Sequence, residues 1–339
     1  DLRNALGEDA DINATGAECN SWVTHPWIYE ERLHPTNWVA DRSIRFLKTR
    51  DRTRPFFLMS SFVRPHQPLD PPQTYFDMYK DKALRLPADG DWDPQEGCGT
   101  AGRISDSIYG CCDESMRLDA MAGYYASITH VDHQLGRILT ALKEDGVYDD
   151  TIILFTSDHG EMLFDHHLWR KVFPYEGSTH IPFLMHIGKH IANVLPHTVN
   201  GITELRDIMP TLLDLCEIPI PDTVDGCSLK KCIFQEASFV RSYLHGEHSF
   251  HSQLSNHYIV TEQDKFIWYS ETGVEQYFDL VHDPRETHNA IADTDKQKRI
   301  AQLRRILIEE LQDREEGYSD GTRLICQKPV DLLSNVYDY

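Results

Sequence analysis

Apolar residues recur at steps of three and four along four segments of this chain, which is the spacing of one face of a helix. The longest of these segments runs from Leu118 to Leu142, and Gly146 follows at a place where such a helix can end. The pattern predicts helices over residues 38–50, 118–142, 202–217 (interrupted by Pro210) and 294–311.

Three shorter segments, residues 55–63, 151–155 and 183–187, are apolar almost without interruption and predict buried strands. A helix precedes an apolar strand twice, which is typical of a sheet covered by helices. The expected fold class is therefore α/β, with a large, mostly parallel sheet sandwiched by helices. Such sheets bind ligands beyond the carboxyl ends of their strands.

The pattern changes after about residue 235. Short aromatic and β-branched runs at 256–261, 265–269 and 275–280 are separated by turns and predict an antiparallel meander. We therefore expect a catalytic domain over residues 1–235 and a smaller C-terminal α+β domain, with an antiparallel sheet, over residues 236–339.

Composition narrows the possible partners. The chain has 339 residues, with 33 Lys and Arg against 54 Asp and Glu and a net charge of −21. This balance argues against nucleic acid, because neutralising phosphates requires clustered basic residues. No apolar run approaches the roughly 18 residues of a membrane span. The eight cysteines lack zinc-site spacing, and we expect reduced structural thiols. A cytoplasmic location is slightly favoured, with periplasmic, secreted and lysosomal locations and the oligomeric state left open.

Polar residues cluster directly after the predicted strand 151–155. Residues 156–171 read TSDHGEMLFDHHLWRK, with Asp158 and His159 at the strand end. A carboxylate and an imidazole here can share one ion: oxygen suits Ca²⁺ or Mg²⁺, whereas nitrogen favours Mn²⁺ or another transition metal. The alternative is a turn in which Asp158 caps a helix and His159 lies at the surface. Lys171 can bind an oxyanion or can be an ordinary solvated side chain.

His66 lies in a second polar cluster, after the predicted strand 55–63. Pro65 and Pro68 restrict the backbone around it and hold the imidazole in place. A single loop histidine is more often without a function. The two clusters occur together at predicted strand ends, however, and this favours a binding site.

Four segments carry motifs in a fixed order along the chain. They are residues 61–68 (SFVRPHQP), 124–136 (YYASITHVDHQLG), 156–182 (TSDHGEMLFDHHLWRKVFPYEGSTHIP) and 277–286 (YFDLVHDPRE). As a set they resemble the sulfatase family of the alkaline phosphatase superfamily. The resemblance covers most of the chain and implies an alkaline phosphatase-like fold.

The resemblance also implies an activity, the hydrolysis of an aryl or carbohydrate sulfate monoester. It makes Asp158 and His159 metal ligands, with Ca²⁺ the expected ion and Mg²⁺ or Mn²⁺ as alternatives. Lys171 becomes a cation on the sulfate and its bridging oxygen, and His66 a contact to the sulfate or leaving group. The chemistry agrees, because a metal ion and a lysine can hold anionic ester oxygens while the S–O bond breaks.

Some positions depart from the family pattern. Phe164 and His167 stand where the family motif has glycines. His166 keeps its family position, which implies contact with the substrate or support of a residue that makes it. We also assign substrate binding to His245 and His248, although packing within the smaller domain is an open alternative.

The family's nucleophile motif, C/S-x-P/A-x-R, is absent from the sequence, and Asp149-Asp150 precedes a strand instead of ending one. We therefore expect the formylglycine nucleophile in a missing N-terminal segment and no turnover by these residues alone. An exposed sheet edge is expected where that segment belongs. Two alternatives remain: a phosphodiesterase or phosphonate monoester hydrolase of the same superfamily, and a non-catalytic relative that binds a sulfated glycan.

Overall fold

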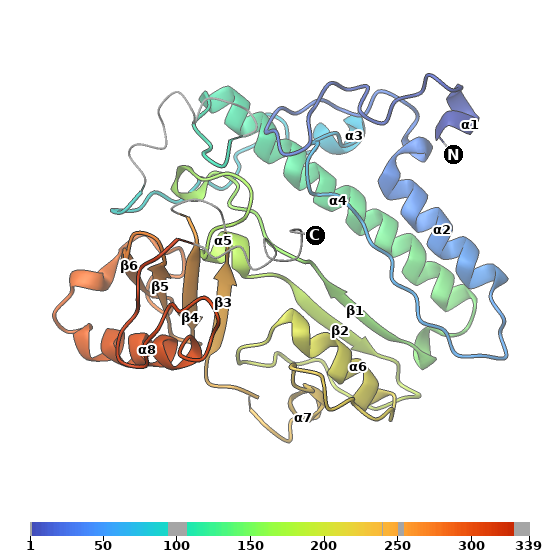
Figure 1. The fold of residues 1–339 in the computed structure, drawn as a ribbon. Helices are drawn as coiled ribbons and strands as arrows, with labels where there is room; N and C mark the ends of the chain where they lie inside the picture. The colour runs from blue at the N-terminus through green and yellow to red at the C-terminus, as the bar shows by residue number, and fades with distance from the viewer. Residues whose placement is uncertain (1, 94–106, 239, 250–253, 329–339) are drawn as a thin grey trace, which may run out of the picture.

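The structure is a computed structural model that describes residues 2–93, 107–238, 240–249 and 254–328 (Figure 1). A pair of long helices lies beside a two-stranded sheet, and a four-stranded sheet with its own helix forms the C-terminal part. The short α-helices are α1 (Leu2–Leu6), α3 (Gln73–Phe76), α5 (Glu176–Thr179) and α7 (Lys230–Ile233). Single 3₁₀ turns occur at Glu31–Leu33, Tyr148–Asp150, Asp165–His167, Leu205–Asp207 and Ala290–Ala292.

The two long helices confirm the predictions from apolar spacing. α2 spans Pro35–Thr49 and α4 spans Glu114–Glu144, and they pack side by side (Figure 1). Their shared core contains Ala40, Leu47, Ile138, Ala141 and Leu142. The period of 3.6 residues places these side chains on facing stripes, which is why the spacing was informative.

Residues 55–63 were predicted to form a buried strand, and this prediction is wrong. The segment is extended, but among the described residues no strand pairs with it. Phe57, Met59 and Val63 are 80%, 77% and 61% exposed. The alternate side chains pack on the core of α2 and α4: Phe56, Leu58 and Phe62. A continuous apolar run predicts burial on both faces, whereas only one face is covered here.

The strands predicted at 151–155 and 183–187 are confirmed as β1 (Ile152–Thr156) and β2 (Phe183–Ile187). They pair antiparallel, with Ile152 opposite Ile187 and Thr156 opposite Phe183. Among the described residues up to 235, the only sheet is therefore this antiparallel pair and not a parallel one. The polar residues 157–182 connect the two strands and lie beyond the carboxyl end of β1.

The helix predicted over 202–217 is shorter than expected. α6 spans Ile208–Leu215, and a 3₁₀ turn at Leu205–Asp207 precedes it. Pro210 lies in the first turn of α6, where the missing N–H has no partner in any helix. The proline therefore marks the beginning of the helix and not an interruption within it.

The C-terminal antiparallel sheet is confirmed, with the order β3-β4-β5-β6. β4 (Asn256–Val260), β5 (Asp264–Tyr269) and β6 (Glu275–Asp279) correspond to the predicted runs. β3 (Leu244–His248) was not predicted, because its sequence LHGEH lacks alternating apolar residues. α8 (Gln297–Glu310) covers the sheet, and its buried leucines and isoleucine pack with residues of β4 to β6: Ile300, Leu303, Leu307, Ile259, Phe266, Trp268 and Tyr277.

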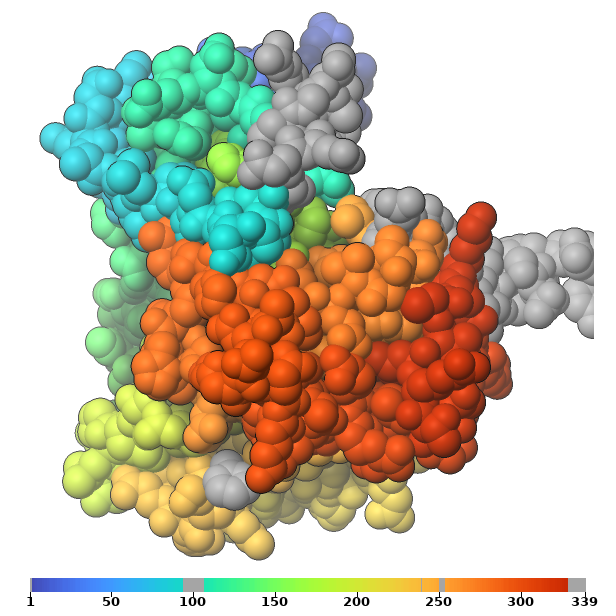
Figure 2. Space-filling model, turned by 90° about the vertical axis from the view of Figure 1, so that its left-hand side faces the viewer, coloured from blue at the N-terminus to red at the C-terminus, as the bar shows by residue number. Residues whose placement is uncertain are grey.

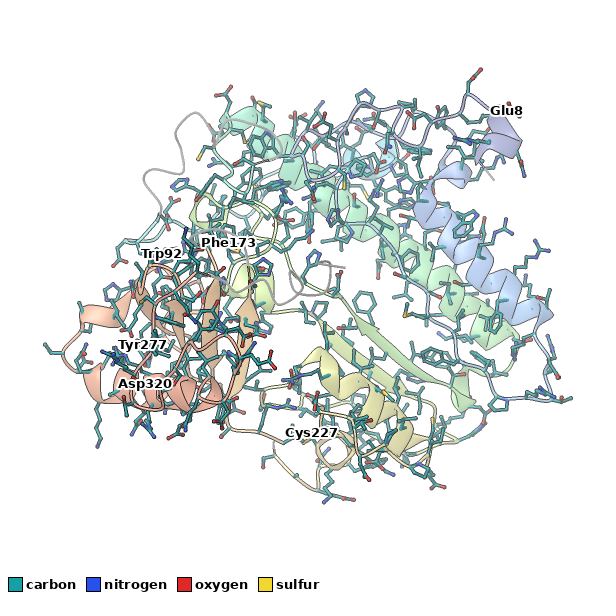
Figure 3. The ribbon with its side chains drawn as sticks, viewed as in Figure 1. Glu8, Trp92, Phe173, Cys227, Tyr277 and Asp320 are labelled. Carbon is teal, nitrogen blue, oxygen red and sulfur yellow. The ribbon has the colours of Figure 1, made fainter. Side chains whose placement is uncertain are left out.

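A segment before residue 94 joins the two parts of the molecule. Trp92 Nε1 donates to the Glu286 carbonyl at 2.6 Å, and Arg285 Nη2 donates to the Leu86 carbonyl at 2.9 Å. Figure 2 shows this segment, in cyan, seated on the orange C-terminal part. Trp92, labelled in Figure 3, also stacks near Tyr175 at 4.4 Å between ring centroids.

A buried ion cluster holds the same boundary. Lys265 on β5 is fully buried, and its Nζ lies 2.7 Å from Glu176 Oε1 and 2.9 Å from Glu286 Oε1. The backbone N–H of Glu176 donates to the other Glu286 oxygen at 2.7 Å. Three charged side chains from α5, β5 and the turn after β6 are therefore fixed against one another.

The thiols depart in part from the expectation of a fully reduced set. Cys111 is disulfide-bonded, whereas the described cysteines 19, 112, 216, 227, 232 and 326 are free. The expectation rested on the size of the core, which says nothing about individual pairs. Within the residues that the structure describes, no helix is long and apolar enough to cross a membrane.

Candidate active site

A buried ion pair fixes the position of the loop that carries His66. Arg64 Nε and Nη2 lie 2.6 and 2.8 Å from the two oxygens of Asp70. Both side chains are buried, and His34 Nε2 lies 3.5 Å from the same carboxylate. A bidentate pair restricts orientation as well as distance, so the loop has a defined position.

His66 and Lys171 lie in direct contact, although 105 positions separate them in the sequence. Lys171 Nζ is 2.6 Å from His66 Nε2. His66 Nδ1 lies 2.9 Å from the Gln67 carbonyl, which can only accept, so Nδ1 carries the proton and Nε2 accepts from the lysine. Burial is the main cause that lowers the pKa of His66, and the Lys171 charge lowers it further.

Lys171 itself is partly buried. Burial lowers its pKa, and the carboxylate of Glu161 acts in the opposite direction. The preceding Trp169 is fully buried, and its Nε1 donates to the Asn20 carbonyl at 2.9 Å, which fixes the turn. The backbone next to Lys171 is therefore anchored by the buried Trp169.

Asp158 and His159 follow β1 at the same place. His159 Nδ1 donates to the Gly160 carbonyl at 2.7 Å, which leaves the lone pair on Nε2. That nitrogen lies 3.7 Å from Asp158 Oδ2, and the Asp158 side chain is 86% exposed. An oxygen and a nitrogen donor thus lie close together on an accessible surface.

The structure brings these four predicted residues into one cluster. The His66 and His159 rings are 6.0 Å apart between centroids, and the Asp158 charge acts on the pKa of Lys171. Two loops, one after residue 63 and one after β1, therefore supply a cation, two imidazoles and a carboxylate. Their assigned roles remain predictions.

His166 lies outside this contact group. It is 2% exposed, with Nδ1 2.8 Å from Asp93 Oδ1 and Nε2 2.9 Å from the Arg285 carbonyl. Both ring nitrogens are thus engaged by the protein, and Trp92 packs on the ring at 4.5 Å. This environment favours the supporting role over direct contact with substrate.

His245 and His248 lie on β3 in the C-terminal sheet. His245 Nε2 lies 3.3 Å from His257 Nδ1 on β4. Burial lowers the pKa of both histidines. No contact of the described residues joins either one to Lys171 or His66, and their predicted substrate role rests on the sequence alone.

Two supporting residues were not assigned from the sequence. Glu161 accepts hydrogen bonds from Gln67 Nε2 at 3.1 Å and from the Leu163 N–H at 3.4 Å. Burial raises the pKa of Glu161. Gln67 is 1% exposed and follows His66, so Glu161 ties the two loops together. In the sequence, the position of Glu161 within the SDHGE motif could have indicated this supporting role.

A cavity of about 310 Å³ lies next to this cluster. Charged and polar side chains dominate its lining, among them Arg85, Glu161, His166, His180 and Arg285. Glu161 lines the cavity, but the four residues of the cluster, Asp158, His159, His66 and Lys171, do not.

Two family models match the chain. The model described as Sulfatase matches residues 10–218, and the model described as N-sulphoglucosamine sulphohydrolase, C-terminal, matches residues 164–314. The chain belongs to the sulfatase family. It is 51% identical over 336 residues to an arylsulfatase of Clostridium perfringens (strain 13 / Type A), covering 99% of this chain and 70% of the relative.

The family also includes more distant relatives of this chain. An arylsulfatase K of Gallus gallus is 30% identical over 292 residues, covering 76% of this chain and 52% of the relative. This sulfatase chain therefore spans about half the length of that relative.

Solved structures confirm the expected alkaline phosphatase-like fold class. A phosphonate monoester hydrolase of Agrobacterium radiobacter matches with a TM-score of 0.76 and 27% identity, over 91% of this chain and 67% of its own. The structure of BT4656, in complex with its substrate D-glucosamine-2-N,6-O-disulfate, matches with a TM-score of 0.67 and 20% identity, over 86% and 72%. The second likeness concerns the fold alone.

Proposed function

We propose that this chain forms part of a sulfatase that hydrolyses an aryl or carbohydrate sulfate monoester. The observation that carries the proposal is the hydrogen-bonded pair Lys171–His66 beside Asp158 and His159. Family membership supplies the reaction class, and the cluster supplies groups suited to it. The formylglycine nucleophile is proposed to come from a segment outside residues 1–339.

Lys171 has the chemistry to hold the sulfate group. An ammonium has three N–H donors, and His66 takes one of them, which leaves donors for anionic ester oxygens. The net charge of −21 repels anions at long range, so a local cation is needed for binding. The proton shared between Lys171 and His66 is placed where it can stabilise or protonate a leaving oxygen.

Asp158 and His159 fit a divalent cation. The His159 lone pair and the exposed Asp158 carboxylate are 3.7 Å apart, and the Gly160 carbonyl fixes the imidazole as metal-bound histidines require. We propose Ca²⁺, because carboxylate oxygen is its preferred ligand, with Mg²⁺ or Mn²⁺ as alternatives. When bound, such an ion polarises the ester oxygens.

A sulfated carbohydrate is one proposed substrate class. The C-terminal family match is to N-sulphoglucosamine sulphohydrolase, and the BT4656 structure contains a disulfated glucosamine. The cavity is lined by Arg85, Arg285 and His180, which pair with the lining carboxylates of Asp165 and Glu176, so it presents both donors and acceptors suited to sugar hydroxyls. Aryl sulfates would need fewer of these contacts.

Phosphonate monoester or phosphodiester hydrolysis is the second candidate function. It is favoured by the likeness to the Agrobacterium phosphonate monoester hydrolase. The same cation and metal pair can bind a phosphoryl oxygen. A preference for Mn²⁺ and for phosphate diesters would distinguish this candidate.

The experiment compares substrate classes with the complete gene product. Initial rates on 4-nitrophenyl sulfate, bis(4-nitrophenyl) phosphate and a phenylphosphonate monoester are measured after reconstitution with Ca²⁺ or Mn²⁺. We expect the highest kcat/KM on the sulfate with Ca²⁺. A higher value on either phosphorus ester would overturn the proposal, and binding of sulfated glycans without any turnover would favour a non-catalytic relative.

The same protein tests the metal ligands. Calorimetric titration with Ca²⁺ should show a site that disappears in Asp158→Ala. Asp222→Ala, at an exposed aspartate far along the sequence, serves as the matched control. Residues 1–339 alone should show no turnover; robust hydrolysis by them would contradict the proposed external nucleophile.

A further inference from the structure

Three potential metal ligands share one face of the C-terminal sheet. β3 and β4 pair antiparallel with Glu247 directly opposite His257. His245 lies two positions before Glu247, and side chains two apart in a strand point to the same face. The pairing therefore places two imidazoles and one carboxylate together on strands that carry none of Asp158, His159, His66 and Lys171.

The distances between the ligand atoms match the edges of a metal tetrahedron. His245 Nε2 is 3.3 Å from His257 Nδ1, which is 3.3 Å from Glu247 Oε2. Zn–N distances of about 2.0–2.1 Å give a tetrahedral edge of about 3.3 Å. The third pair of ligand atoms also lies within 4.8 Å.

The protein around the cluster restrains these ligands. His257 is 6% exposed and packs on Trp268 and Tyr318 at 5.9 and 5.1 Å between centroids. The His245 and His257 rings are nearly parallel, with an interplanar angle of 15°. The His257 ring is therefore packed in place before any ion binds, which reduces the entropy lost on binding.

Arg314 is the neighbour that orients the carboxylate. Its guanidinium contacts both oxygens of Glu247 and also lies 2.6 Å from Glu316 Oε1. Metal-bound carboxylates are commonly held by such outer hydrogen bonds. Glu316 offsets the positive charge that Arg314 brings near the site.

We propose that His245, Glu247 and His257 bind a transition-metal ion, with Zn²⁺ the best match to the ligand set and spacing. Three protein ligands leave a fourth position for water. The ion would fasten β3, the edge strand, to β4 and to the segment that carries Arg314. This site is separate in chemistry and in sequence from the proposed Ca²⁺ ligands Asp158 and His159.

The test uses the complete gene product with Asp158→Ala already present, so that binding at the other candidate site is removed. After treatment with a chelator, Zn²⁺ is titrated by calorimetry and Co²⁺ by visible absorption, which reports four-coordinate geometry. We expect one Zn²⁺ per chain. His245→Asn should weaken binding by more than the roughly 10- to 100-fold that loss of an outer partner of a metal ligand costs.

Controls separate loss of a ligand from loss of structure. His282→Asn changes a histidine that is 82% exposed on its side chain and should bind Zn²⁺ normally. Glu247→Gln keeps the shape of the side chain, so it serves if His245→Asn does not fold, which circular dichroism will show. Absence of Zn²⁺ binding in the Asp158→Ala chain, or full binding in both ligand variants, would overturn the proposal and leave a hydrogen-bonded network.

Discussion

The buried Lys265 between Glu176 and Glu286 makes a quantitative prediction about stability. Its Nζ lies 2.7 and 2.9 Å from the two carboxylates, and its side chain is 0% exposed. Lys265→Met keeps the length of the side chain but removes the charge. Two carboxylates would then remain at a buried boundary without their cation.

The magnitude follows from the pKa of Glu176. Burial raises it, but the Lys265 charge and the His180 hydrogen bond outweigh burial and lower it to about 2 from the usual 4.5. A difference of about 2.5 units corresponds to about 3.4 kcal/mol at 1.36 kcal/mol per unit. Breaking a buried pair by removing one partner costs about 3–5 kcal/mol. His180 supplies part of the shift, so we expect a loss of about 3 kcal/mol.

The pH dependence has a defined sign. Because the folded pKa of Glu176 is depressed, its stabilisation is present above about pH 4.5 and is lost as the pH falls toward 2. In Lys265→Met the unpaired carboxylates have raised pKa values, so that variant gains stability as they become protonated. The difference between the two proteins should therefore be largest near pH 7 and shrink in acid.

The assay is urea unfolding followed by tryptophan fluorescence at pH 7 and pH 4.5, with the slopes compared to confirm similar exposed surface. Lys189→Met is the matched control, because Lys189 pairs with Asp149 at 2.6 Å but is 67% exposed. Its unfolding midpoint should not change measurably. A Lys265→Met protein as stable as the control at pH 7 would refute the reasoning.

Two other predictions concern residues 55–70. Asp70→Asn should destabilise the chain by about 3–5 kcal/mol, because it leaves the charge of the buried Arg64 uncompensated. It should also lower kcat in the complete gene product, because the loop that carries His66 loses its support. An unchanged urea midpoint would contradict this prediction. The double variant Phe57→Glu with Met59→Lys should self-associate less than the parent chain in sedimentation experiments. The reason is that these apolar side chains are 80% and 77% exposed. Equal association of the variant and the parent chain would show that this face does not cause self-association.

Much of the fold was predictable because its signals are local. The period of 3.6 residues identified α2 and α4, and aromatic and β-branched runs identified β4 to β6. β3 was not predicted, because its sequence LHGEH is polar and contains glycine, and only its pairing with β4 makes it a strand. The strand predicted at residues 55–63 was wrong for the opposite reason. The local pattern is that of a strand, but a strand also needs a partner to pair with.

The site was predictable in its members but not in its contacts. Residues 156–171 show polar chemistry after an apolar strand, so Asp158, His159 and Lys171 stand out. The bond from Lys171 to His66 joins residues 105 positions apart, and His166 meets Asp93 across 73 positions. Such distances depend on the whole chain path, which no local pattern specifies.

The central claim is that Lys171, held by His66, stabilises the sulfate group during hydrolysis. The most direct measurement is the kcat on 4-nitrophenyl sulfate of the complete gene product with Lys171→Ala, beside Lys189→Ala as the exposed-lysine control. Removing one such donor typically lowers kcat by about 10²- to 10³-fold. We expect a loss of this size with Lys171→Ala and no loss with Lys189→Ala. A Lys171→Ala protein that hydrolyses the ester as fast as the control would contradict the claim.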